Sequence, residues 1–219
     1  MIRKLFVIFF LVLISTTLSA QSQAVIKEMT GKVEIRVGTG SWQPARSGVA
    51  LPTGAYISTG FNSTAVLDLA GSLLQVNPLT RMQIKELIEK EGTLSTELFL
   101  RVGKVKAEVK SVEGLIQDFK LRSPVSTAAV RGTDFEFDGV TVTVINGTVS
   151  FSNTYNQTRS VGGGEDSSTT GTDLPSQGNQ GKSDRSTVQV NTGPTGQGAL
   201  NTPGAPLLEK ATVTVVWNW

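Results

Sequence analysis

Apolar and polar residues alternate along most of the chain from Val25 to Phe151. The stretch "GKVEIRV" (31–37) places two valines and an isoleucine on one side of a strand and charged residues on the other. The same pattern returns in 63–76, 81–87, 98–110, 119–130 and 135–151. A period of two residues is typical of strands with one buried face, and strands spaced by about ten residues without long helical stretches favour a sandwich or a barrel. We therefore predict an all-β domain of antiparallel strands.

One segment competes with this prediction. "TRMQIKELIEKEG" (80–92) also has a helical spacing of apolar residues, and its glutamates and lysines favour helix. We predict a strand over 81–87 and a charged hairpin loop over 88–93.

Two dipeptides predict tight turns near the end of the alternating region. Asp138-Gly139 and Asn146-Gly147 tolerate the positive φ that a two-residue hairpin turn requires. They predict a three-stranded meander that runs through Phe135, Val144 and Val149.

The first 24 residues differ from the rest. Arg3 and Lys4 precede an apolar run from Leu5 to Ile14, and small polar residues follow it. This order is typical of a signal peptide, and the run is shorter than the ~20 residues of a membrane span. We expect cleavage after Ala20 or Ala24, no transmembrane span afterwards, and a periplasmic or secreted bacterial protein.

Residues 159–210 are dominated by Gly, Ser, Thr, Gln, Asn and Pro. Such a segment buries too little apolar surface to offset the backbone ordering entropy, about 1–2 kcal/mol per residue. We therefore predict that the β domain covers 25–158 and that 159–210 is a disordered, flexible linker.

The chain closes with a β segment, "ATVTVVWNW" (211–219), in which Trp217 and Trp219 share one face. Two interpretations stay open. The segment either returns to pair with an open edge of its own domain, or it adds as a strand to the sheet of a partner, with the tryptophans as anchors.

The amino-acid composition limits the kinds of catalytic and metal sites that the chain can form. The 219 residues include no histidine and no cysteine, which removes the commonest general base, the thiol nucleophile and the usual zinc ligands. We expect no catalytic site, no cofactor and no metal site. The net charge is only +2, with 20 basic and 18 acidic residues, and the basic residues are scattered, so we expect no nucleic-acid partner.

The stretch "SPVSTAAVRGTDFEF" (123–137) places Arg131-Gly132-Thr133 between two strands. Gly132 suits a bend that other residues resist. We interpret the triplet as a structural turn motif, in which the Arg131 guanidinium folds onto backbone carbonyls or onto a carboxylate such as Asp134 or Asp68. The alternative is that Arg131 binds a partner.

Three aromatic residues, Trp42, Tyr56 and Phe61, are candidates for partner binding. A tryptophan near a proline at a turn, as in Trp42-Gln43-Pro44, is expected to plug the core. The alternative is that these aromatic side chains are exposed and stack on sugar rings.

The order of these motifs resembles the FecR domain of bacterial envelope proteins over residues 25–151. The resemblance rests on the first strand of "GKVEIRVGTGSWQPARSG" (31–48), on Gly103-Lys104-Val105, on the Arg131-Gly132-Thr133-x-Phe135 stretch and on "TVTVINGTVSF" (141–151). It implies a jelly-roll-like, antiparallel β-sandwich.

FecR proteins are sensors with a cytoplasmic anti-sigma segment, one membrane span and a periplasmic part. Here the charged residues lead directly into the apolar run, so we expect no anti-sigma domain. We expect a non-catalytic, exported envelope protein whose FecR-like domain is a protein-interaction or scaffold module. The alternative is a carbohydrate- or peptidoglycan-binding module.

Overall fold

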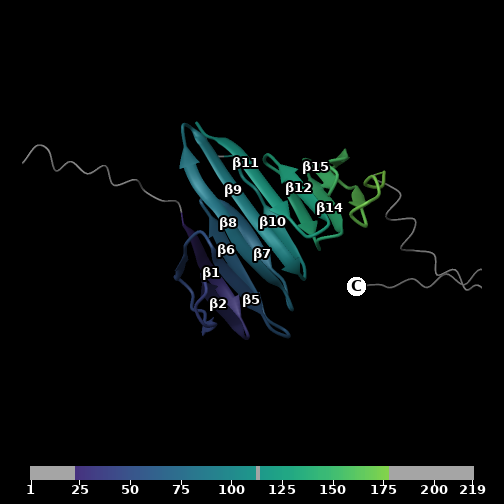
Figure 1. The fold of residues 1–219 in the computed structure, drawn as a ribbon. Helices are drawn as coiled ribbons and strands as arrows, with labels where there is room; N and C mark the ends of the chain where they lie inside the picture. The colour runs from purple at the N-terminus through teal and green to yellow at the C-terminus, as the bar shows by residue number, and fades with distance from the viewer. Residues whose placement is uncertain (1–22, 112–113, 178–219) are drawn as a thin grey trace, which may run out of the picture.

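The computed structural model describes residues 23–111 and 114–177, and within them the chain forms strands and turns only. No helix in this part of the chain is long and apolar enough to cross a membrane. The strands form two mainly antiparallel sheets that pack against each other (Figure 1). The prediction of an all-β sandwich is confirmed.

The eight-stranded sheet has the order β17 (Asp166–Ser168), β14 (Thr141–Asn146), β13 (Asp134–Phe137), β10 (Val105–Glu108), β7 (Ser72–Val76), β6 (Thr64–Leu69), β1 (Ala24–Thr30) and β4 (Ala50–Leu51). The nine-stranded sheet has the order β16 (Thr158–Gly162), β15 (Thr148–Asn153), β12 (Ser126–Val130), β11 (Ile116–Arg122), β9 (Thr93–Val102), β8 (Arg81–Lys90), β5 (Ala55–Thr59), β2 (Val33–Val37) and β3 (Gln43–Pro44).

The chain winds progressively from one edge of the sandwich to the other. From β6 onward each new strand joins its sheet beside the one formed before it, and the colour gradient in Figure 1 follows this order across the molecule. The connectivity therefore differs from the Greek-key returns of a jelly roll. One pair, β9 with β11, is parallel, because β10 carries the chain back through the opposite sheet between them.

The core lies between the sheets and is filled by the apolar side of each alternating strand. Phe119 of β11 meets Phe135 of β13 edge to face with centroids 6.4 Å apart, and Phe137 of β13 meets Phe151 of β15 at 6.3 Å. Each pair joins the two sheets. Such a contact contributes about 0.5–1.5 kcal/mol beyond the burial of the rings.

The β8–β9 hairpin corrects the predicted loop at 88–93. The strand prediction for 81–87 is confirmed, but pairing continues to Lys90 opposite Thr93. The turn is only Glu91-Gly92, with φ of 51° and 76°, which are the left-handed values of a two-residue hairpin turn. The charged residues we assigned to a loop are the exposed end of a long ribbon.

The meander predicted over 135–151 is half right. β13 and β14 form a hairpin around Gly139, but β15 leaves for the other sheet, where it pairs with β12 and β16. Gly147 is therefore the point at which the chain crosses between sheets. A Cβ at Gly147 would lie 2.9 Å from Thr133 Oγ1 and 3.1 Å from the Gly132 carbonyl, so only glycine fits there.

The linker boundary at residue 159 is wrong. β16 and β17 lie inside the segment predicted to be disordered, and Val161 is fully buried. Side-chain hydrogen bonds hold the chain beyond them: Arg159 Nε donates to the Pro175 carbonyl at 2.7 Å, and Asn153 Nδ2 donates to the Asp173 carbonyl at 3.0 Å. Polar pairing orders a segment whose composition has few apolar residues. The remainder of the predicted linker, 178–210, lies outside the described residues.

Candidate functional site

The side of the nine-stranded sheet that faces away from the other sheet, here called the outer face, carries two of the three predicted aromatic residues. Alternation places Val33 and Ile57 toward the core and Arg36 and Tyr56 on the outer face. These outward side chains are half-buried rather than fully exposed, because they lie against their neighbours on adjacent strands.

Strand register aligns these side chains in one row across the sheet. Arg36 pairs with Tyr56, Tyr56 with Gln83, Gln83 with Phe99, and Phe99 with Arg122. At the edge, Ile35 pairs with Gln43, which brings the preceding Trp42 beside Arg36. Since strands lie about 4.8 Å apart, the row extends over roughly 24 Å. It contains Trp42, Arg36, Tyr56, Gln83, Phe99 and Arg122.

Four residues at one end of this row form what we call the aromatic–arginine cluster: Arg36, Trp42, Tyr56 and Arg81. The Trp42 and Tyr56 rings meet edge to face at 6.4 Å. The Arg36 guanidinium carbon lies 4.4 Å from the Tyr56 ring centroid and 5.0 Å from that of Trp42. Arg81 lies 5.2 Å from the Trp42 centroid. Each cation–π contact contributes about 0.5–1 kcal/mol at an exposed site, so the cluster is held in place before any ligand arrives.

The cluster contains two cations and no acid of its own. Within the described part of the chain neither arginine forms an ion pair, and Arg36 Nε is buried without a hydrogen-bond acceptor. Glu34, the nearest acid along β2, contacts Lys32 at 3.4 Å. The positive charge of the cluster is therefore not balanced within the described residues.

The structure changes the interpretation of Trp42. We expected this side chain to plug the core, but its ring contacts Tyr56 and two arginines on the outer face. The sequence did not single out Arg36 or Arg81. The alternation of 31–37 could have placed Arg36 on the outer face, but its proximity to Arg81 follows only from the register of three strand pairs.

The third predicted aromatic residue, Phe61, lies apart from the cluster. It is 81% exposed in the loop between β5 and β6, at the end of the sandwich.

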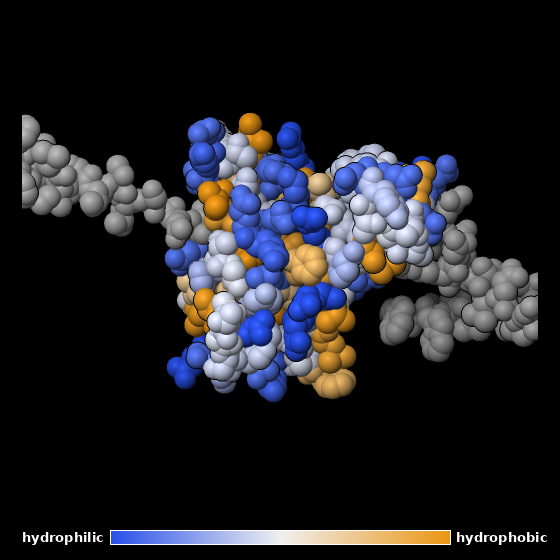
Figure 2. Space-filling view, viewed as in Figure 1, coloured by the Kyte–Doolittle hydropathy of each residue, from blue (hydrophilic) through white to orange (hydrophobic). Residues whose placement is uncertain are grey.

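Figure 2 shows a mainly polar surface on the face in view, with apolar residues in small separate groups. Trp217 and Trp219 lie outside the described residues, and the two roles considered for them stay predictions.

The Arg131-Gly132-Thr133 triplet forms a turn, but not in the way we expected. Gly132 has φ of 63°, and Thr133 is buried, with its hydroxyl donating to the Thr148 carbonyl at 3.0 Å. The Arg131 side chain is exposed and has no hydrogen bond or ion pair within 23–111 and 114–177. Asp68, one suggested partner, contacts Lys27 at 3.3 Å instead. Thr133 rather than Arg131 fixes the turn.

Arg131 instead borders a hollow of about 660 Å³ on the outer face, over β11, β12, β15 and β16. Short side chains form its floor, among them Ala129, Ser150 and Ser160. They lie in one register row, Ala129 opposite Ser150 and Ser150 opposite Ser160. The outer face thus has two parts: aromatic and cationic side chains over β2, β5 and β8, and a hollow lined by short side chains over β11, β12, β15 and β16.

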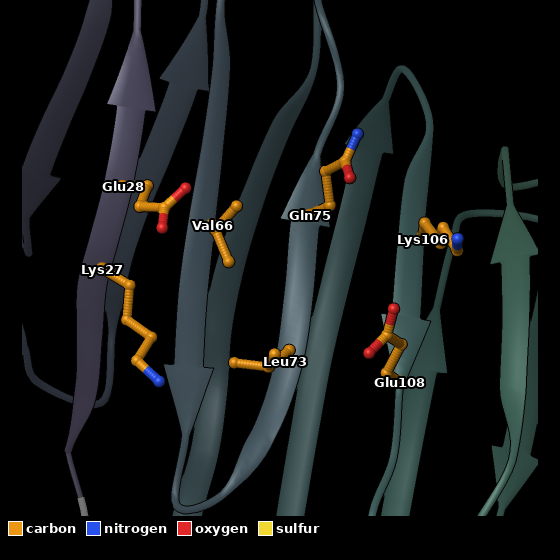
Figure 3. Close-up of a pocket in the computed structure, with 7 residues that line it drawn as sticks. All are labelled: Lys27, Glu28, Val66, Leu73, Gln75, Lys106 and Glu108. Atoms are coloured by element: carbon orange, nitrogen blue, oxygen red, sulfur yellow. The ribbon is translucent and has the colours of Figure 1, made fainter.

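A second hollow, of about 310 Å³, lies on the opposite sheet (Figure 3). Val66 and Leu73 lie between the charged residues of β1 and those of β10, as Figure 3 shows. Charges of both signs flank this apolar centre: Lys27 and Glu28 on one side, Lys106 and Glu108 on the other. Opposite charges so close together leave little net field for a charged ligand.

Metal chemistry finds no support in the described residues, where no three acidic side chains come together in a way that could hold an ion. The outer face instead presents aromatic rings, guanidinium groups and hydroxyls on a sheet, which are groups suited to binding a ligand.

Comparison with known proteins agrees with the resemblance noted in the sequence. Two crystal structures of a candidate anti-sigma factor from Parabacteroides distasonis are similar, with TM-scores of 0.45 and 0.46 and sequence identities of 19% and 18%. Each alignment covers 55% of this chain and 58% of that protein, so the chain matches little more than half of its length. No curated protein matches. The family model for FecR protein matches residues 55–150, from the start of β5 into β15, so this part of the chain is similar to that family.

Proposed function

We propose that this protein is a non-catalytic, exported component of the bacterial envelope, whose FecR domain binds a protein partner through the outer face of the nine-stranded sheet. The aromatic–arginine cluster is the observation that supports the proposal. Tyr56 and Arg81 lie inside the stretch that matches the family model, whereas Arg36 of β2 and Trp42, which precedes β3, lie before it.

The composition of the cluster fits a protein interface. Tryptophan, tyrosine and arginine are the residues most enriched among those that dominate binding energy. Trp42 and Tyr56 present large rings whose positions are fixed by contacts with Arg36. These side chains therefore lose little conformational entropy when a partner binds to the outer face, and such pre-organisation strengthens binding.

The experiment is photo-crosslinking in the native envelope with a photoreactive residue at Gln83, which lies beside Tyr56 in the row. We expect one major crosslinked protein, and we expect Trp42→Ala to reduce its yield about tenfold, the effect of losing about 1.4 kcal/mol. Tyr155→Ala is the matched control, because Tyr155 is 68% exposed and lies at the opposite edge of the sandwich. Equal losses in the two variants, or no crosslinked protein at all, would contradict the proposal.

Glycan binding is the rival function, and the polar hollow beside Arg131 is the observation that favours it. Its serine and threonine hydroxyls could hydrogen-bond sugar hydroxyls. Retention of the protein on purified cell wall, abolished by Ser150→Val and unchanged by Trp42→Ala, would assign the outer face to a glycan instead of a protein.

A further inference from the structure

We infer that the aromatic–arginine cluster is a carboxylate-binding site, and that it receives an acidic side chain from an extended segment of the partner protein. The inference that the site binds an anion depends on the cluster alone, whereas the inference that the anion belongs to a protein rests on the proposed function.

The first argument is the proximity of two like charges. The Arg36 and Arg81 guanidinium carbons lie 5.0 Å and 5.2 Å from the same Trp42 ring centroid, so they are at most about 10 Å apart. Two cations at this distance repel each other. An anion that contacts both would replace this repulsion with two attractions.

The second argument is the charge balance of the surrounding face. Three basic residues of the outer face have acidic partners: Lys32 contacts Glu34 at 3.4 Å, Arg122 contacts Glu97 at 3.3 Å, and Lys120 contacts Asp118 at 2.8 Å. Arg36 and Arg81 have none among the described residues. Lys85, whose ammonium lies 5.8 Å from the Phe99 centroid in the same row, has no acidic partner among them either, so this end of the outer face carries positive charge without a counter-charge.

The third argument is the direction of the Arg36 side chain. Its Nε is buried, whereas its two terminal amino groups are not among the buried unpaired atoms, so they remain open to a ligand. Two parallel N–H groups match the two oxygens of a carboxylate. The rings of Trp42 and Tyr56 fix the plane of this fork, which reduces the entropy lost on binding.

The ring faces favour a peptide carboxylate over an acidic sugar. A sugar binds an aromatic residue by stacking on an open ring face. Here Arg36 lies over Tyr56, and both arginines lie over Trp42. The guanidinium groups thus cover ring surface on which a sugar would stack, and they leave their own hydrogen-bonding edges for the ligand.

The test measures binding of a fluorescently labelled decaglutamate peptide to the full-length mature protein by fluorescence polarisation. We expect Arg36→Gln and Arg81→Gln each to lower the affinity about tenfold, as loss of one charge-assisted bidentate contact does. Arg46→Gln is the matched control, since Arg46 is exposed outside the cluster, and we expect its affinity to stay within about twofold of the parent protein. In ¹⁵N NMR, the Arg36 Nε–H resonance should shift on titration with the peptide.

Other outcomes overturn the inference. An equal loss of affinity in Arg46→Gln would show only general electrostatic attraction, and absence of decaglutamate binding would remove the anion site. Tighter binding of oligogalacturonate than of decaglutamate, with the same dependence on Arg36, would keep the carboxylate site but overturn its protein source. The envelope crosslink at Gln83 is a separate readout. If it depends on Trp42 while decaglutamate fails to bind, the proposed function stands and the carboxylate site does not.

Discussion

The turn at Arg131-Gly132-Thr133 can be tested directly, because in the structure the threonine, and not the arginine, makes the contacts that hold the turn. Thr133 is 1% exposed, and its hydroxyl donates to the Thr148 carbonyl at 3.0 Å, across the point where the chain changes sheets. Its own carbonyl accepts from the Val109 amide at 3.0 Å. The Arg131 side chain is exposed and unpaired among the described residues.

Thr133→Val keeps the shape of the side chain and removes the hydroxyl. Loss of a buried hydrogen bond, with the Thr148 carbonyl left short of a donor, costs about 1–2 kcal/mol. For a domain of this size 1 kcal/mol corresponds to about 2–4 °C, so we expect the Tm to fall by about 2–8 °C. Arg131→Ala changes an exposed side chain, which is usually within about 0.5 kcal/mol, so its Tm should move by less than about 2 °C.

The assay is thermal unfolding followed by circular dichroism near 218 nm, a wavelength typical of strands. Thr143→Val is the control, because Thr143 is half-buried on β14 and its hydroxyl forms no hydrogen bond within the described chain. A Tm that falls with Arg131→Ala and stays constant with Thr133→Val would refute the reasoning. It would restore the arginine as the residue that pins the turn.

Three further predictions test the fold. Gly103→Ala should lower the Tm by more than about 4 °C, because φ is 101° and a Cβ would overlap Thr80 Cα and Oγ1; Gly92→Ala, where φ is 76° but no atom lies within 4 Å of the added Cβ, should lower it less in the same melting experiment. A chain that ends at residue 158 should have a Tm about 4–8 °C below that of a chain that ends at 177. The shorter chain loses β16 and the burial of Val161, which contributes about 2 kcal/mol to stability. Equal melting temperatures would show that 159–177 does not contribute to the folded domain. Mass spectrometry of the secreted protein should find Gln21 at the N-terminus, because Ala24 is fully buried in β1 and pairs with Leu51 and Leu69; a mature chain that begins at Val25 would contradict this.

The fold could be predicted as far as the faces of its strands, because alternation alone decides which side chains are buried. It could not be predicted at the crossings between sheets. Gly139 and Gly147 both follow a turn-forming residue and have φ of 91° and 90°, yet one closes a hairpin and the other sends the chain to the opposite sheet. The difference lies in tertiary contacts, among them the Thr133 hydroxyl that binds the carbonyl after Gly147, and no local pattern encodes them.

The candidate site shows the same division. Trp42 and Tyr56 attracted attention as aromatic residues, which residue type alone can suggest. Arg36 and Arg81 are separated by 44 residues in the chain, and only the register of β3 with β2, of β2 with β5 and of β5 with β8 brings them to the same ring. A sequence that specifies each strand well still leaves the relative shift of neighbouring strands to packing, and a shift of one residue would move the row to the core side.

This separation of faces has a consequence for function. In the stretch that matches the family model, the positive-φ glycines, the buried threonines and the apolar core residues lie at the turns and between the sheets. The aromatic–arginine cluster lies on the opposite side of the same strands and does not belong to the buried core. Substitutions in it should therefore change binding with little effect on folding, because each cation–π contact contributes only about 0.5–1 kcal/mol. The fold and the proposed binding surface can therefore be tested by separate substitutions.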